Sequence, residues 1–92
     1  MMLDPKETRR QRELFNLLLE TAANAGIEII EDRINRRGGV CRLDERMVVV
    51  YDSHAPWAQR NKLIIEAIRR LKLDDVYLPP KVRQILEETT GP

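Results

Sequence analysis

A single cysteine and a single histidine are the first residues of this sequence that could do chemistry together. Cys41 lies in a short β-rich stretch, and His54 lies just after another such stretch. A thiolate and an imidazole in hydrogen-bonding contact form the nucleophile and base of a hydrolase, and Asp52 is placed to orient the ring. A degenerate Cys-His hydrolase is therefore one hypothesis. The simpler interpretations are a structural cysteine and a solvated loop histidine.

The chain contains few residues that could bind a metal ion, and it lacks a glycine-rich phosphate loop. One cysteine and one histidine exclude an internal disulfide, a zinc site of several cysteines and a site with two histidines. Asp74 and Asp75 are adjacent, so their side chains point apart in regular structure, and we interpret them as turn or capping residues. Gly38 and Gly39 precede a β-rich stretch and not a helix, which excludes a phosphate loop at a helix N-terminus. We therefore predict no metal and no cofactor.

Arginines are concentrated in a few short parts of the chain, although the formal net charge is only +1. If folding brings these parts together, they would form a local site for phosphates or other anions. Trp57 is the only aromatic residue near the basic stretch 60–72, so stacking of nucleic-acid bases has little support. Glu66 and Arg70 have the spacing of an ordinary helical ion pair. The alternative of nucleic-acid or anion binding, which we do not favour, would use these residues: Arg9, Arg10, Arg12, Arg36, Arg37, Arg69 and Arg70.

The first element that could position these groups is a helix over residues 5–25. Asp4 and Pro5 form a typical helix start, because Asp accepts hydrogen bonds from free N–H groups and Pro fits the first turn. Leucine and alanine recur every three or four residues through this stretch, which predicts one buried face. Gly26 is typical of the position just after a helix end. The first group of arginines therefore belongs to the opening turns of this helix.

Three β-rich stretches follow, at residues 27–31, 40–43 and 46–51. A Gly-containing segment connects the first two, and Asp44-Glu45 provides a hairpin between the last two. Short connections predict an antiparallel meander. The stretch 46–51 is apolar throughout, which is typical of a central strand covered on both faces or of a strand with one face in an interface.

Two further helices complete the predicted fold. Trp57, Ile64 and Ile68 recur on one face of a helix over residues 56–71, and a short helix over 81–88 is expected to close an edge of the sheet. The chain is then a single α+β domain of residues 1–92 with the order α-β-β-β-α-α. Helices pack on a three-stranded antiparallel meander. Residues 1–4 and 89–92 are expected to be frayed ends.

Residues 27–71 resemble the core of the ImmA/IrrE-type zinc metallopeptidases. In that family a strand, a loop and a Pro-bearing turn, matched here by residues 48–56, lead into a helix that carries His-Glu-x-x-His. The register that retains the motif glutamate places it at Glu66. Ile65 and Arg69 then occupy the positions of the two zinc-binding histidines. The resemblance implies a zincin-like scaffold without metal ligands and without hydrolysis.

A second resemblance covers more of the chain. Residues 38–43 and the tail 73–86 are similar to segments of small bacterial proteins without a known activity. Together the two resemblances imply a non-catalytic interaction or structural module, which is our preferred prediction. Exposed strand edges favour pairing, so we expect a protein partner or a homodimer that forms through Met47–Tyr51 or Val40–Leu43.

The expected compartment follows from what the chain lacks. Its longest apolar runs are far below the ~20 residues needed to cross a bilayer. Its charged first residues do not form a secretory signal. With a lone thiol, we predict a cytoplasmic protein that does not bind membranes.

Overall fold

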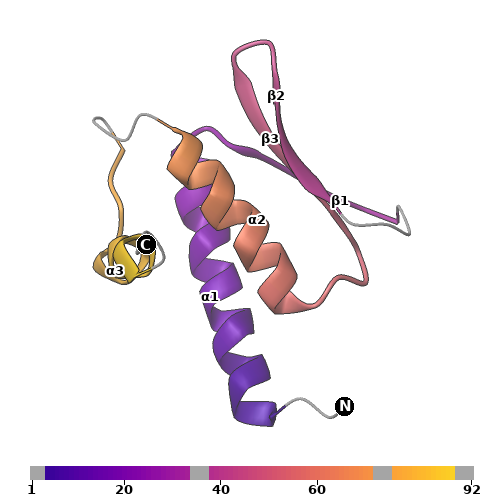
Figure 1. Ribbon diagram of the computed structural model, residues 1–92, viewed down its shortest axis with the longest axis vertical. Coiled ribbons are helices and arrows are strands. Elements are labelled where there is room, and N and C mark those ends of the chain that lie inside the picture. Colours follow the sequence, from indigo (N-terminus) through magenta and orange to yellow (C-terminus); the bar gives the residue numbers. More distant parts are fainter. Residues whose placement is uncertain (1–3, 34–37, 72–75, 89–92) are drawn as a thin grey trace.

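A computed structural model describes residues 4–33, 38–71 and 76–88 of the chain (Figure 1). The α+β class and the element order α-β-β-β-α-α agree with the prediction. The elements in chain order are α1 (Pro5–Asn24), β1 (Glu28–Asp32), β2 (Gly39–Leu43), β3 (Arg46–Asp52), α2 (Trp57–Arg70) and α3 (Pro80–Glu88).

The ends of α1 follow from the residues that flank it. Asp4 Oδ1 accepts a hydrogen bond from the Lys6 N–H at 2.9 Å, and Pro5 occupies the first helical position. Asp4 is therefore the helix cap and not part of a frayed end. Gly26 follows the helix with a φ of +80°, a conformation that glycine adopts without strain. This turn directs the chain from α1 into β1.

The predicted antiparallel meander is wrong, because the sheet is mixed. The strand order is β1-β3-β2, with β1 parallel and β2 antiparallel to β3. A hairpin at Asp44 and Glu45 places β2 along one edge of β3, as expected. β1 pairs with the other edge of β3. This order gives the most apolar strand a neighbour on both sides, and Met47–Val49 are buried.

The two long helices lie side by side on one face of the sheet (Figure 1). Met47, Val49 and Tyr51 alternate along β3 on the face that packs against them. The phenyl ring of Phe15 on α1 lies 5.9 Å from the ring of Tyr51 in an edge-to-face arrangement. The apolar core consists of Phe15, Leu18, Ala22, Ile27, Met47, Val49, Tyr51, Ile64, Ala67, Ile68, Leu78, Val82 and Leu86.

The expected position of the last helix is also wrong. Figure 1 shows α3 beside the helical layer, on the side away from the sheet, so it does not close a sheet edge. Val82 and Leu86 on α3 are buried and belong to the core. Arg69 Nη2 on α2 donates to the Leu86 carbonyl oxygen at 3.2 Å. The apolar face of α3 therefore completes the helical layer.

Candidate interaction surface

Cys41 and His54 do not come together. Cys41 on β2 pairs with Val48, and His54 lies two residues beyond Asp52, the last residue of β3. With a rise near 3.3 Å per residue, Val48 and Asp52 are about 13 Å apart along the strand. The thiol therefore lies beside the middle of β3 and the imidazole beyond its end, and no Cys-His dyad forms in this geometry.

The surroundings of His54 agree with the simpler interpretation of a loop histidine. Its side chain is 70% exposed, and its Nδ1 lies 3.9 Å from Asp52 Oδ2. The same carboxylate oxygen accepts a hydrogen bond from the His54 backbone N–H at 3.2 Å. Such a contact is typical of an Asp that stabilises a turn. Asp52 thus shapes the loop that leads to α2.

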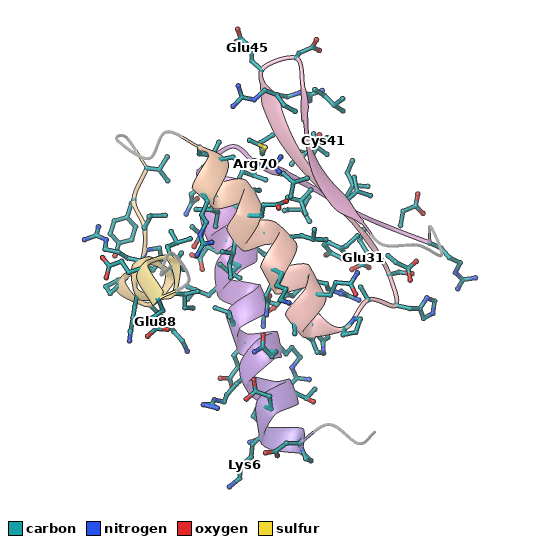
Figure 2. All side chains as sticks on the ribbon, viewed as in Figure 1. Lys6, Glu31, Cys41, Glu45, Arg70 and Glu88 are labelled. Atoms are coloured by element: carbon teal, nitrogen blue, oxygen red, sulfur yellow. The ribbon has the colours of Figure 1, made fainter. Side chains whose placement is uncertain are left out.

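The arginines singled out in the sequence form separate groups. Arg10 on α1 pairs with Glu7 at 3.2 Å, and Arg70 on α2 pairs with Glu66 at 3.6 Å, as its spacing predicts. Figure 2 shows Lys6 and Arg70 at opposite ends of the helical layer. Arg9 and Arg12 accompany Arg10 on α1, Arg69 contacts Leu86, and Arg36 and Arg37 lie outside the described residues.

Glu66 lies on an exposed part of α2. It lines a pocket of about 340 Å³ together with Lys62, Ile65 and Arg69. Ile65 and Arg69 bring no metal-binding atom to this pocket at neutral pH. Within residues 4–33, 38–71 and 76–88, no group of three or more His, Cys, Asp or Glu side chains could hold a metal ion.

Two pockets at the start of α2 also lack a set of reactive groups. They measure about 440 and 420 Å³ and share Pro56 and Ala58. Among the described residues, Lys62 is the one charged residue that lines the first pocket, and Glu7 is the one that lines the second. Within the same described part of the chain, neither pocket is lined by both an acidic and a basic side chain.

Arg60 is the residue whose environment differs most from the sequence prediction. The sequence places it in the basic stretch 60–72, yet it is only 7% exposed. Its guanidinium carbon lies 4.5 Å from the ring centroid of Trp57, 4.8 Å from that of Tyr51 and 5.5 Å from that of Phe15. A signal was present, because Arg60 precedes Ile64 by four residues and so shares its face of the helix. The guanidinium is enclosed by aromatic rings and is not a surface cation.

The hydrogen bonds of Arg60 explain why a charge is stable in this place. Its Nε donates to the Ala55 carbonyl oxygen at 2.9 Å, and its Nη2 donates to that of Ser53 at 2.7 Å. Its Nη1 donates to Glu31 Oε1 on β1 at 2.9 Å. Arg60 therefore ties the loop before α2 to the sheet, and its contacts are structural.

Asn61, the next residue, joins the two long helices. It is 2% exposed, and its Nδ2 donates both to the Gln11 carbonyl oxygen at 2.8 Å and to Gln11 Oε1 at 2.9 Å. These bonds set the position of α2 along the axis of α1. The two polar residues on the buried side of α2 thus set its position between sheet and helix.

Tyr51 is expected to titrate above its ordinary value near 10. Burial raises the pKa of the Tyr51 phenol, and the Glu31 carboxylate raises it further, while Arg60 opposes the shift. The Tyr77→Phe variant leaves Tyr51 as the only tyrosine, so phenolate absorbance would report it alone. We expect a midpoint above 10, and a lower midpoint when Glu31 is replaced with Gln.

The same shift predicts how stability changes in alkali. The folded state disfavours the phenolate, so this contribution is fully present below the unfolded pKa near 10. It is lost as the pH rises through the higher pKa of folded Tyr51. A midpoint at or below 10 in Tyr77→Phe would contradict the buried position of the phenol.

The face of the sheet that the helices do not cover carries a set of apolar side chains. Cross-strand partners share a face, so Ile30 lies beside Val50, and Cys41 lies beside Val48. Ile30 is 37% exposed and Leu43 is 51% exposed, whereas Val48 is only 1% exposed. We call this surface the open face, and its residues are Glu28, Ile30, Asp32, Gly39, Cys41, Leu43, Arg46, Val48, Val50 and Asp52.

Two charged residues of the open face form an ion pair. Arg46 Nη1 lies 3.7 Å from Glu28 Oε1, and the two residues lie diagonally across the β1–β3 pair. Both side chains are largely exposed, so the ion pair adds little stability. Asp32 and Asp52 lie opposite each other on the same face, at the far end of β1 and β3.

Both outer edges of the sheet are open within the described residues, because β3 alone has a neighbour on each side. The predicted pairing through Met47–Tyr51 is therefore wrong, since this strand has no unpaired edge. The other predicted strand, Val40–Leu43, does lie along an edge. Figure 1 shows the β2–β3 hairpin extending past the end of α2. The open face and the β2 edge together form the candidate interaction surface.

Comparison with known proteins does not assign this surface. No protein family, curated protein or solved structure matches the chain. None of the described helices is both long enough and apolar enough to cross a membrane.

Proposed function

We propose that this chain is a non-catalytic protein-interaction module that binds an extended strand of a partner at its β2 edge. Strand addition at a sheet edge combines backbone hydrogen bonds with contacts to alternate side chains. In this proposal the module acts in the cytoplasm. Its own fold is a zincin-like scaffold that has lost its metal ligands.

The exposure of the open face is the observation that carries the proposal. Ile30 and Leu43 are two of the three large hydrophobic residues that are exposed among the described residues, and both lie on this face. Leu43 belongs to β2 itself, where an added strand would cover it. Ile30 lies on β1 at the opposite edge of the sheet, so Leu43 is the exposed residue that marks the β2 edge. An exposed apolar side chain on an unpaired edge strand is typical of an interaction site.

A photoreactive residue can test this surface in the cell. Leu43 would be replaced with benzoylphenylalanine, and the matched control would carry the same residue at Glu13 on the exposed side of α1. We expect light-dependent adducts from position 43 and none from position 13. The absence of adducts from position 43 would contradict the proposal.

The edge itself is tested with a second substitution. Backbone groups alternate in direction along β2, and the Arg42 N–H points away from β3. Arg42→Pro therefore removes a donor that an added strand needs. Arg42→Thr keeps that donor and removes the same charge. Adducts from position 43 should disappear with Arg42→Pro and persist with Arg42→Thr. Equal adduct yields in both variants would contradict strand addition.

A further inference from the structure

We infer that the strand that pairs with β2 is β2 of a second copy, in an antiparallel arrangement centred on Cys41. The inference rests on the proposed function and names the partner. The two sheets would join into one continuous sheet with both open faces on the same side.

The hairpin determines which backbone groups of β2 point outward. Leu43 and Arg46 flank its two-residue turn and pair with each other. In such a turn the Leu43 carbonyl accepts from the Arg46 N–H, so the backbone of Leu43 points toward β3. Backbone groups alternate along an antiparallel strand, so those of Val40 and Arg42 point to the unpaired edge. The edge thus presents two donors and two acceptors around Cys41.

This pattern is complementary to itself. When two copies of β2 run antiparallel with Cys41 opposite Cys41, Val40 of each copy lies opposite Arg42 of the other. The outward N–H and C=O groups of these residues then meet in reciprocal hydrogen bonds. The cysteines form the non-hydrogen-bonded pair between them, with Cα atoms about 4.5 Å apart.

The side chains fit the same register. Leu43 of one copy lies opposite Gly39 of the other, and both are on the open face. Gly39 has open space where a side chain would be, since an added Cβ meets nothing within 4 Å. The 51% exposed Leu43 can therefore pack over the Gly39 backbone of the second copy.

Other registers are less favourable. Centring the pair on Arg42 would place two like charges directly opposite each other, which is destabilising. Centring it on Gly39 or Leu43 would shorten the overlap of a strand that has only five residues. The register centred on Cys41 uses the whole strand and keeps each arginine opposite a valine.

The single cysteine makes the register measurable in the purified full chain. Diamide oxidises two thiols to a disulfide and takes up their two hydrogens. Cross-strand thiols in this register satisfy the Cα separation that a disulfide needs. We expect the wild type to sediment as a dimer and to form the disulfide at least about tenfold faster than Cys41→Ser/Glu13→Cys, because pairing raises the effective thiol concentration.

Two matched variants separate the register from non-specific contact. Arg42→Pro should sediment as a monomer and lose the fast oxidation, whereas Arg42→Thr should retain both properties. Circular dichroism of each variant would show whether the fold is kept. In Cys41→Ser/Arg42→Cys the thiols lie on the other face and not opposite each other, so oxidation should be slow.

The outcomes distinguish this inference from the proposed function. A wild type that is monomeric at about 100 μM, far above the Kd of a stable dimer, would overturn the second copy as partner. If position 43 still forms adducts in the cell, and their mass is not twice that of the chain, the partner is a different protein. Oxidation that is equally fast in Cys41→Ser/Arg42→Cys would overturn the register even if a dimer forms.

Discussion

Replacing Arg60 with alanine is expected to lower the free energy of unfolding by about 4 kcal/mol. The substitution leaves a cavity among the rings of Trp57, Tyr51 and Phe15, which the guanidinium now fills. It also removes the hydrogen bonds that hold the loop before α2. Because domains of this size have a stability of only about 5–15 kcal/mol, this loss would remove a large share of it.

Urea denaturation followed by circular dichroism would measure this loss. Arg83→Ala provides the matched control, because Arg83 is an exposed arginine on α3, and it should change stability by less than about 0.5 kcal/mol. Arg60→Lys should fall between the two, since an ammonium cannot reproduce the planar set of donors. A loss below about 1 kcal/mol for Arg60→Ala would show that Arg60 does not hold the loop.

The contribution of the ion pair can be separated from that of the rings. The Glu31 side chain is 50% exposed, whereas that of Arg60 is 9% exposed. Water therefore screens the carboxylate, and Glu31→Gln should cost less than about 1 kcal/mol. Most of the effect of Arg60 then comes from its packing between rings and from its bonds to backbone carbonyls.

The helices and strands follow from local patterns, which is why most of their bounds agree with the prediction. Asp4 and Gly26 mark the two ends of α1 through capping and a positive φ. Both are effects of neighbouring residues and need no knowledge of the rest of the fold. The strands β2 and β3 likewise follow from β-branched residues on either side of a short turn.

The sheet topology could not be obtained in this way. The apolar stretch 46–51 was recognised as a candidate central strand, yet the pattern of β1 is the same whether it pairs with β2 or with β3. Pairing is decided by which arrangement buries Val48 and Val49, a property of the whole domain. The expected meander failed at this step, and the edge predicted at Met47–Tyr51 failed with it.

The candidate site shows the same limit. Residue types alone suggested that Cys41 and His54 could react together, but the register of β3 separates them. The sequence places Arg60 in a basic stretch, which indicates a surface charge. It nevertheless shares the buried face of α2 with Ile64. Conversely, Val40–Leu43 was predicted as a pairing strand from its residues, and the structure places it along an edge. Distance between elements is the information that local patterns lack.

Gly38→Ala should cost about 3 kcal/mol, because the structure leaves no room for a side chain at this position. An added Cβ would overlap the Val50 carbonyl oxygen and would lie 2.8 Å from Tyr51 Cα. These are backbone atoms of the central strand, so they cannot move aside as a flexible side chain would. The start of β2 would have to move away from β3.

Gly39 provides the matched control for this prediction, because an added Cβ there meets nothing within 4 Å. Gly39→Ala should change stability by less than about 0.5 kcal/mol, since it removes freedom from the unfolded chain without a clash. Thermal unfolding at low protein concentration would compare the two variants without a contribution from self-association. Equal stabilities would contradict the close contact between Gly38 and β3. If only Gly38→Ala is destabilised, the first residues of β2 are held by backbone packing against the central strand, which keeps the edge strand in place for pairing.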